Sequence, residues 1–322
     1  MAAAEGRGPV LVALGANSAI AVGKLAAGLL TGSGAMLAEA VHSLADAVNQ
    51  VFLLVGLNLS DTHADDEHPH GYGKEAFFWS FLAAVFIFVA GATFSIFEGT
   101  RTLVESEFHE RSTTELAVAF VVLGLAFVFE AITLMVAVRA LRRGARRRGW
   151  TFWQFVRESP DMTTKTVFWE DSAATTGLLL AAGGLALAES TRNVVWDGVA
   201  SLSIGVLLAG VALMLGMQTR RFLLGAAAHP EVREALRELV LEFDEVENII
   251  RLLTMQLGTR SVLVTGDLQV VPDLTTDQIE DLILRIDEEI RSHIPEVSET
   301  FWELRRHPLD SAVGRRLFEA HL

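Results

Sequence analysis

Two side chains in an apolar stretch near the N-terminus have the types and spacing of a metal site. His42 and Asp46 lie four residues apart in the sequence A-E-A-V-H-S-L-A-D-A-V-N-Q. On a helix this spacing places both side chains on one face. Imidazole and carboxylate groups bind divalent transition metals, and within a membrane such groups usually mark an ion pathway. The alternative is a polar pair that is buried for helix packing.

A second polar intrusion occurs in the apolar sequence F-W-E-D-S-A-A-T-T-G, where Glu170 and Asp171 are adjacent. Unpaired carboxylates are costly in lipid, so we expect both to face the protein interior, where a cation would neutralise them. With His42 and Asp46 they offer one imidazole and three carboxylates. This set suits tetrahedral zinc and is compatible with octahedral manganese or iron. Alternatively, one of the acids pairs with Lys24 or with an arginine at a helix end.

Residues 61–74, D-T-H-A-D-D-E-H-P-H-G-Y-G-K, concentrate histidines and acids. Asp65 and His68 come within chelating range of each other if this segment turns, and His63 and His70 could assist. The alternative is a solvated acidic loop that collects cations weakly.

Several other polar residues interrupt the apolar segments. Asn49 and Gln50 extend the face of His42 and Asp46 by one turn, and could either join a metal shell or hold helices together. Isolated acids could also line a pathway, but such residues more often hydrogen-bond to helix ends, so we do not assign them as ligands; they are Glu98, Glu130 and Asp197.

The elements that position these residues are apolar segments long enough to cross a bilayer. The chain has 322 residues, 51% of them hydrophobic, gathered in blocks of about twenty residues. We predict six membrane spans, at 9–31, 34–59, 76–103, 114–138, 163–188 and 195–219. Arginines cluster in the predicted loop at 139–148 and again at 220–221. Because basic loops stay in the cytoplasm, we expect both termini to be cytoplasmic.

From about Ala226 the pattern becomes that of a soluble domain, with elements in the order α-β-β-α-β. This order is typical of a small α+β fold of the ferredoxin-like kind. We therefore expect a six-helix transmembrane domain at 1–222 and a cytoplasmic ferredoxin-like domain at 223–322. The second carries 20 acidic and 10 basic residues from Ala226 onward, which argues against a nucleic-acid partner. The absence of cysteine excludes disulfides and thiolate metal sites.

These motifs resemble the cation diffusion facilitator family of zinc and related metal exporters. The similar stretches are the first hairpin with its G-S-x-A and H-S-x-x-D motifs, H-P-H-G-Y-G-K-E at 68–75, E-D-S-A-A at 170–174 and W-D-G-V-A-S-L at 196–202. The resemblance covers nearly the whole length of the chain. Within the family, the chain is most similar to the branch that in animals contains a mitochondrial zinc transporter.

The resemblance implies a four-ligand transport site, with two ligands from span two and two from span five. His42, Asp46 and Asp171 match three of these positions. The fourth is usually a histidine but is Val167 here, which cannot bind a metal. Its place would be taken by Glu170, or else by Asn49, Gln50 or water.

The family's loop site is matched at Asp65 and His68, but its usual third ligand is replaced by Tyr72, which predicts a weaker site. The soluble domain offers only His229, His293 and His307, so we do not assign the family's metal sites there.

We therefore expect a homodimeric antiporter rather than an enzyme. It would export a divalent cation from the cytoplasm in exchange for protons, and zinc is the cation that we expect. It needs no cofactor besides the transported metal, and by resemblance the C-terminal domain would help to hold the dimer. We expect it in the lipid bilayer of a bacterial plasma membrane. The rival hypotheses are a manganese or iron(II) exporter of the same fold and a non-transporting, membrane-anchored metal sensor or scaffold.

Overall fold

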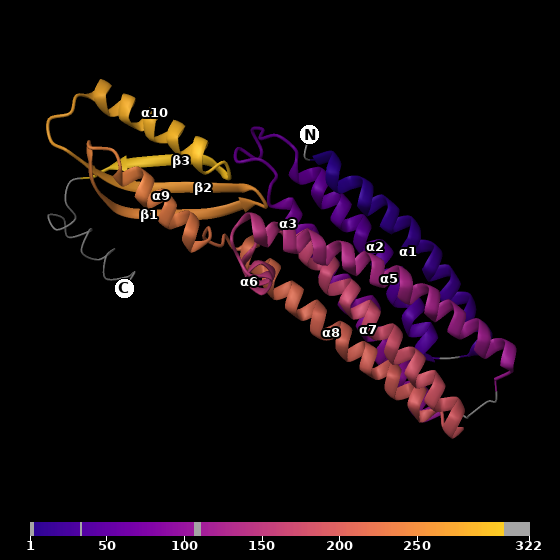
Figure 1. Cartoon of the computed structure of the whole chain (residues 1–322). Helices are drawn as coiled ribbons and strands as arrows, with labels where there is room; N and C mark the ends of the chain where they lie inside the picture. The colour runs from indigo at the N-terminus through magenta and orange to yellow at the C-terminus, as the bar shows by residue number, and fades with distance from the viewer. Residues whose placement is uncertain (1–2, 33, 106–110, 306–322) are drawn as a thin grey trace. The chain divides into compact units, whose positions relative to one another are not determined.

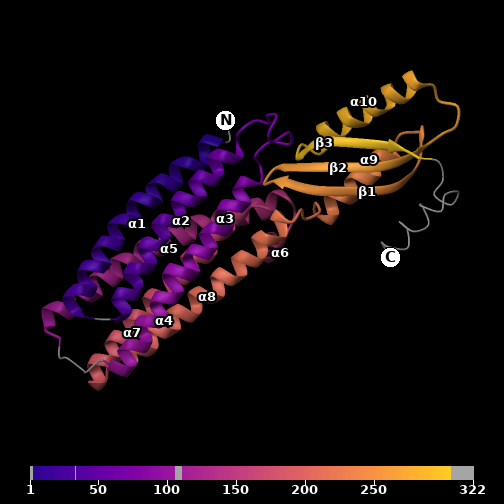
Figure 2. The same cartoon turned by 180° about the vertical axis from the view of Figure 1, so that it is seen from behind.

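The computed structural model describes residues 3–32, 34–105 and 111–305. The chain divides into two compact units, Met1–Arg221 and Phe222–Leu322. The first unit consists of helices, and the second combines helices with a small sheet (Figures 1 and 2).

The first unit is a bundle of long helices. In chain order its elements are α1 (Ala3–Thr31), α2 (Gly34–Ser60), α3 (Glu75–Phe86), the π-helical segment η1 (Ile87–Ala92), α4 (Thr93–Glu105), α5 (Thr113–Arg147), the short α6 (Phe152–Glu158), α7 (Met162–Thr191) and α8 (Val195–Leu223). Each of the predicted spans falls on one of the long helical segments, with α3, η1 and α4 together forming the third.

Five helical segments of the described chain are long and apolar enough to cross a membrane. They are Met36–Ser60, Glu75–Val104, Thr113–Arg147, Met162–Thr191 and Val195–Leu223. In α1, the described side chains give a shorter apolar helix at Asn17–Leu30. The predicted class, a membrane helix bundle followed by an α+β domain, is confirmed.

The arginine-rich stretch after the fourth predicted span is helical, and the prediction that it forms a loop is wrong. Helix α5 continues to Arg147 and therefore includes most of these arginines. Its 35 residues span about 52 Å at 1.5 Å per residue, well beyond the ~30 Å of a bilayer core. Residues 139–147 of α5 are alanine, leucine and arginine apart from Gly144. Because these three residue types favour helix, the helix continues beyond the apolar region.

Four helices surround the polar residues of the sequence analysis. Helix α1 contacts α2 and α5, α7 contacts the same two helices, and α3 and α4 pack on α2. Small residues bring α7, α8 and α4 close together. A side chain at Gly184 would collide with Ala200, and one at Gly99 would collide with the backbone of Leu202. Close backbone approach through small residues is the usual way in which membrane helices pack.

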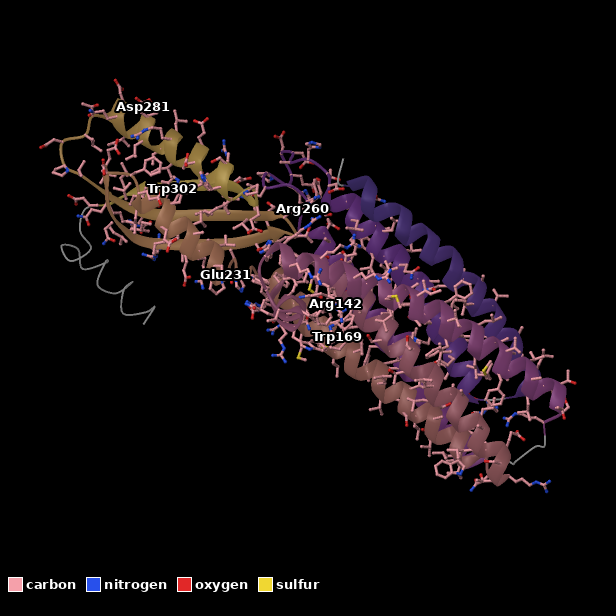
Figure 3. The ribbon with its side chains drawn as sticks, viewed as in Figure 1. Arg142, Trp169, Glu231, Arg260, Asp281 and Trp302 are labelled. Carbon is pink, nitrogen blue, oxygen red and sulfur yellow. The ribbon has the colours of Figure 1, made fainter. Side chains whose placement is uncertain are left out.

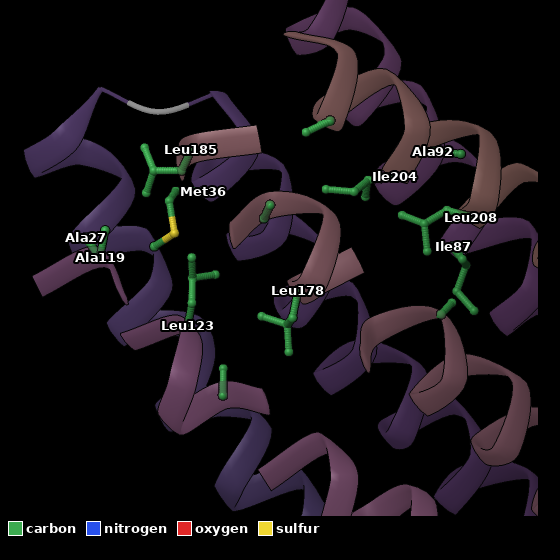
Figure 4. Close-up of a cluster of buried hydrophobic side chains, with 14 of the residues drawn as sticks. Ala27, Met36, Ile87, Ala92, Ala119, Leu123, Leu178, Leu185, Ile204 and Leu208 are labelled. Atoms are coloured by element: carbon green, nitrogen blue, oxygen red, sulfur yellow. The ribbon is translucent and has the colours of Figure 1, made fainter. Parts of the chain in front are cut away.

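An apolar cluster fills the bundle between these helices. Figure 4 shows Leu178 of α7 together with Ile204 and Leu208 of α8, and Ile87 lies beside Leu208. Met36 of α2 and Leu123 of α5 belong to the same buried cluster.

Aromatic residues gather around α6, which was not predicted from the sequence. Phe155 of α6 packs with Phe168 of α7 and with Trp150, which precedes α6, in one buried cluster. Figure 3 labels Arg142 and Trp169 near this helix; Arg142 lies over the ring of Phe152. Aromatic and arginine side chains together are typical of a membrane interface.

The second unit contains α9 (Pro230–Leu241), β1 (Val246–Gly258), β2 (Ser261–Val270), α10 (Thr276–His293) and β3 (Val297–Leu304). Its sheet has the order β1-β2-β3, with β1 antiparallel to β2 and β2 parallel to β3. Apolar residues of α9 and α10 form one core with those of the strands. Thr275 forms a capping box with Gln278 at the start of α10.

Candidate metal-binding site

Helix α2 carries a continuous stripe of buried polar side chains. The members recur every three or four residues, which keeps them on one face of the helix. Each is at most 6% exposed. They are Glu39, His42, Ser43, Asp46, Asn49 and Gln50. The predicted pair is therefore part of a longer polar face, which is buried within the bundle.

His42 and Asp46 lie close together on this face. Nδ1 of His42 is 3.4 Å from Oδ1 of Asp46. Within the described part of the chain, three of their atoms have no hydrogen-bond partner: the two ring nitrogens of His42 and Oδ1 of Asp46. Buried polar atoms are normally hydrogen-bonded, and exceptions call for an explanation such as an ion. These atoms are therefore the part of the α2 face that most needs a further partner.

Glu170 of α7 meets the same face of α2. It accepts a hydrogen bond on Oε2 from the side-chain amide of Asn49. It also forms a side-chain hydrogen bond with Asp46. A hydrogen bond between two carboxyl groups contains a proton, so Asp46 and Glu170 can hold one between them. The structure thus joins α2 to α7 through two acids and an amide.

Asp171 belongs to the same group of acids and lies beside α5. Thr133 of α5 is close to Asp171, and its hydroxyl donates to the backbone carbonyl of Glu130 at 3.0 Å. Glu130, one turn earlier on α5, is buried and interacts electrostatically with both Asp46 and Asp171. The sequence analysis did not assign Glu130 as a ligand. In the sequence, Glu130 is recognisable only as a single acid within a long apolar segment.

Lys24 of α1 is fully buried and donates to Oε2 of Glu39 at 3.0 Å and to Oγ of Ser43 at 2.6 Å. The alternative in which Lys24 pairs with Glu170 or Asp171 is therefore wrong. The lysine supplies a fixed positive charge beside the acids of α2.

Two residues one turn before the acids of α7 differ in their surroundings. Val167 is half-buried and packs against the aromatic cluster around α6. Thr166 is fully buried, and its hydroxyl has no hydrogen-bond partner in the described chain. The hydroxyl lies one turn before Glu170, so it is an additional oxygen that the sequence analysis missed.

These groups do not form a finished coordination shell. Among the described residues, no three imidazole or carboxylate groups are close enough to hold one metal ion. Assembly of such a shell from His42, Asp46, Glu170 and Asp171 therefore requires movement of side chains or of α2 relative to α7.

The loop candidates lie together in a turn closed by Tyr72. Nδ1 of His68 is 3.8 Å from Oδ1 of Asp65, and the ring of Tyr72 stacks 4.0 Å from that of His68. The Tyr72 hydroxyl donates to Oδ2 of Asp65 at 2.8 Å. The backbone N–H of His68 and the Tyr72 hydroxyl lower the pKa of Asp65; the same bond to Asp65 raises the pKa of Tyr72. Tyr72 therefore occupies one oxygen that a metal would need.

Three further acids of the bundle are paired with arginines. Glu189 lies 2.7 Å from Arg111, and Asp197 lies 3.8 Å from the same side chain. Glu98 is 3.6 Å from Arg101. This agrees with leaving Glu98 and Asp197 out of the ligand set.

Comparison with known proteins identifies the family. Residues 10–224 match the cation efflux transmembrane domain, which is about two thirds of the chain. The chain belongs to the cation diffusion facilitator family. The chain is thus an integral membrane protein of the family that the sequence motifs predicted.

Its relatives include transporters of different metals. It is 35% identical over 253 residues to the human protein named proton-coupled zinc antiporter SLC30A9, mitochondrial, a match that covers 79% of this chain and 44% of the relative. It is 37% identical to metal tolerance protein C4 of Arabidopsis thaliana over 60% of this chain and 41% of that protein. It is 25% identical to the manganese efflux system protein MneP of Bacillus subtilis over 90% of this chain and 92% of that protein.

The likeness to the mitochondrial branch was predicted from the sequence motifs and is confirmed. This cation diffusion facilitator spans less than half the length of the first two relatives.

Proposed function

We propose that this protein exports zinc from the cytoplasm in exchange for protons by alternating access. His42, Asp46, Glu170 and Asp171 form the transport site. The metal binds while the site faces the cytoplasm, and protons replace it once the site faces the other side of the membrane. Each ligand must lose its proton to bind a metal, so proton and metal compete for the same atoms.

The observation that carries the proposal is the hydrogen bond between Asp46 and Glu170. It places a proton where a metal ion would bind. A cation that bridges these acids displaces that proton. When the cation leaves, a proton returns and the hydrogen bond between α2 and α7 forms again. The unpartnered ring nitrogens of His42 support the same site, because a neutral imidazole is a good zinc ligand.

The choice of zinc rests on ligand chemistry and on similarity. Imidazole favours zinc more than carboxylate or water does. The relative named as a proton-coupled zinc antiporter is similar over most of this chain.

A second candidate is export of manganese or iron(II) through the same site. Val167 cannot bind metal, so the site offers one imidazole and a surplus of carboxylates, which suit manganese. The similarity to a manganese efflux protein over 90% of the chain supports this alternative.

Further parts of the proposal concern location and assembly. The N-terminal end of α1, the 61–74 loop, α6 and the end of α8 lie at one end of the bundle (Figures 1 and 2). The arginines at 139–148 and 220–221 argue that this end faces the cytoplasm. We place the protein in a bacterial plasma membrane as a homodimer, with the unit beginning at Phe222 in the cytoplasm.

Flux into proteoliposomes tests the proposal. Purified protein is reconstituted with an internal metal indicator and an internal pH dye, and zinc, manganese or iron(II) is added outside. Zinc uptake should be accompanied by proton release from the vesicles and should exceed uptake of the other two metals. Uptake equal to that of protein-free vesicles for all three metals would exclude transport, and faster manganese or iron(II) flux would favour the second candidate.

A further inference from the structure

A contact between Glu39 of α2 and Gly177 of α7 lies two helical turns from the proposed transport site. A side chain built at Gly177 would collide with Oε1 of Glu39, and its next neighbour is Ile204 of α8 at 3.8 Å. Glu39 and Gly177 are both buried in the described structure. The carboxylate thus rests against the backbone of α7 in a space that only glycine leaves open.

The register of the two helices links this contact to the acids. Glu39 precedes Asp46 by seven residues, and Gly177 follows Glu170 by seven, which is about two turns in each helix. Asp46 meets Glu170 through a hydrogen bond, and Glu39 meets Gly177. The two contacts therefore belong to one antiparallel interface, separated by about 10 Å along the helix axes.

The carboxylate of Glu39 is held through one of its two oxygens, so moving it away from α7 would strain that contact. Its Oε2 accepts a hydrogen bond from Lys24, which is anchored on α1 and also donates to Ser43. All three side chains are almost completely buried. Separating this ion pair would leave charge uncompensated in the membrane. A methyl group at Gly177 would therefore displace α7 rather than Glu39.

We infer that Lys24, Glu39 and Gly177 set the closest approach of α2 and α7, and so keep Asp46 and Glu170 within reach of each other. They are positioning residues, and the inference rests on the proposed function of the acid site. Lys24 fixes Glu39, Glu39 limits the approach of α7, and Gly177 permits that approach. The separation that results is the one at which Glu170 reaches Asp46 and Asn49.

The test compares two alanine substitutions in one helix. Gly177→Ala introduces the collision, whereas Gly183→Ala adds the same methyl group on α7 where nothing lies within 4 Å. Gly177→Ala should lower the ratio of maximal zinc flux to KM by roughly ten- to a hundredfold, mainly through KM, since small misplacements cost about that much. Gly183→Ala should behave as the native protein.

Shortening the acid should restore function. Glu39→Asp retracts the carboxylate by one methylene group, so the double variant Gly177→Ala with Glu39→Asp should recover zinc KM to within about threefold of native. A general folding defect at Gly177 would not be relieved by this substitution, because Glu39→Asp on its own weakens the contact with Lys24.

A distance measurement gives a readout that does not depend on transport. The chain has no cysteine, so spin labels can be attached to cysteines introduced at the exposed positions Leu44 of α2 and Leu179 of α7. Labelled protein is diluted with unlabelled protein to isolate distances within one chain. The distance distribution should shift in Gly177→Ala, and not in Gly183→Ala.

The outcomes separate the inference from the proposed function. An unshifted distance in Gly177→Ala, or native zinc KM in that variant while Asp46→Ala is inactive, would overturn the inference. Native flux in Asp46→Ala would instead reject the acid site, and the label distances would still report whether Gly177 sets the helix separation.

Discussion

The side-chain amide of Asn49 donates to Oε2 of Glu170, 121 residues further along the chain. This bond holds the carboxylate of Glu170 against α2, next to Asp46. Because Asp46 also hydrogen-bonds to Glu170, a metal that bridged these two acids would have to displace the proton between them. That displacement would lower the affinity for the metal at these oxygens.

Asp46→Ala should abolish zinc flux while the protein remains folded in detergent. The substitution removes the acid that contacts both His42 and Glu170. Asp46→Asn is the matched control for size and should also be inactive, because an amide cannot supply the negative charge. Zinc flux with native metal dependence in Asp46→Ala would show that metal is bound elsewhere.

Lys24→Met should destabilise the protein by about 3–5 kcal/mol, because it leaves the buried carboxylate of Glu39 without its partner. The double variant with Glu39→Gln should regain most of this stability, since neither charge then remains. Unfolding in detergent, followed by tryptophan fluorescence, measures both. Equal stability of the native protein and Lys24→Met would show that the ion pair contributes nothing to folding.

Much of the bundle could be predicted because membrane helices follow simple rules. Apolar blocks of about twenty residues locate the spans, and the four-residue spacing of His42 and Asp46 defines a face. Periodicity cannot tell which helices meet. Asn49 and Glu170, or Lys24 and Glu39, are brought together by packing between distant segments, so neither pair could be assigned from the sequence.

The soluble unit was easier to predict than the details of the bundle. Its helices and strands follow local signals, and their order, α9, β1, β2, α10 and β3, is the expected α-β-β-α-β. By contrast, α6 is only seven residues long and depends on contacts with Phe168 and Trp150. The roles of Glu130 and Gly177 likewise depend on which helix faces them.

The pKa of Asp65 should rise toward its ordinary value in Tyr72→Phe. The backbone N–H of His68 and the Tyr72 hydroxyl both lower this pKa, and the substitution removes the second. A lowered pKa means that the native turn is favoured above the ordinary pKa of aspartate and is lost as pH falls through the lowered value. The Tyr72→Phe turn should therefore open at higher pH than the native turn.

Carbon-13 NMR of labelled aspartates in nanodiscs measures this titration, with Asp65→Asn to assign the signal. An unchanged midpoint in Tyr72→Phe would mean that the hydroxyl does not contact Asp65 in solution.

His68→Ala should slow zinc uptake at low metal concentration and leave the maximal rate nearly unchanged. The loop holds only two matched ligands, and Tyr72 occupies an oxygen of one of them, so the loop collects metal without limiting its passage. Initial rates over a range of zinc concentrations measure both quantities. His63→Ala serves as a control for loss of a loop imidazole. Complete loss of flux in His68→Ala would show that the loop is as essential for zinc transport as the buried acids.

The last prediction concerns the fourth ligand. If Glu170 serves in place of the missing histidine, Glu170→Ala should cut zinc flux at least tenfold, because the loss removes a ligand and leaves Asn49 unpartnered. If Glu170→Ala transports as the native protein does, then Glu170 is not a ligand, and the fourth position belongs to water, Asn49 or Gln50.

Val167→His then tests the position itself. Residue 167 lies one turn before Asp171, so an imidazole there can join His42, Asp46 and Asp171, provided that it leaves the aromatic cluster against which Val167 packs. Two imidazoles and two carboxylates favour zinc over manganese more than the native set does. The variant should therefore raise the ratio of zinc flux to manganese flux and should make Glu170→Ala harmless in the double variant. An unchanged flux ratio would show that position 167 faces the cluster and not the metal.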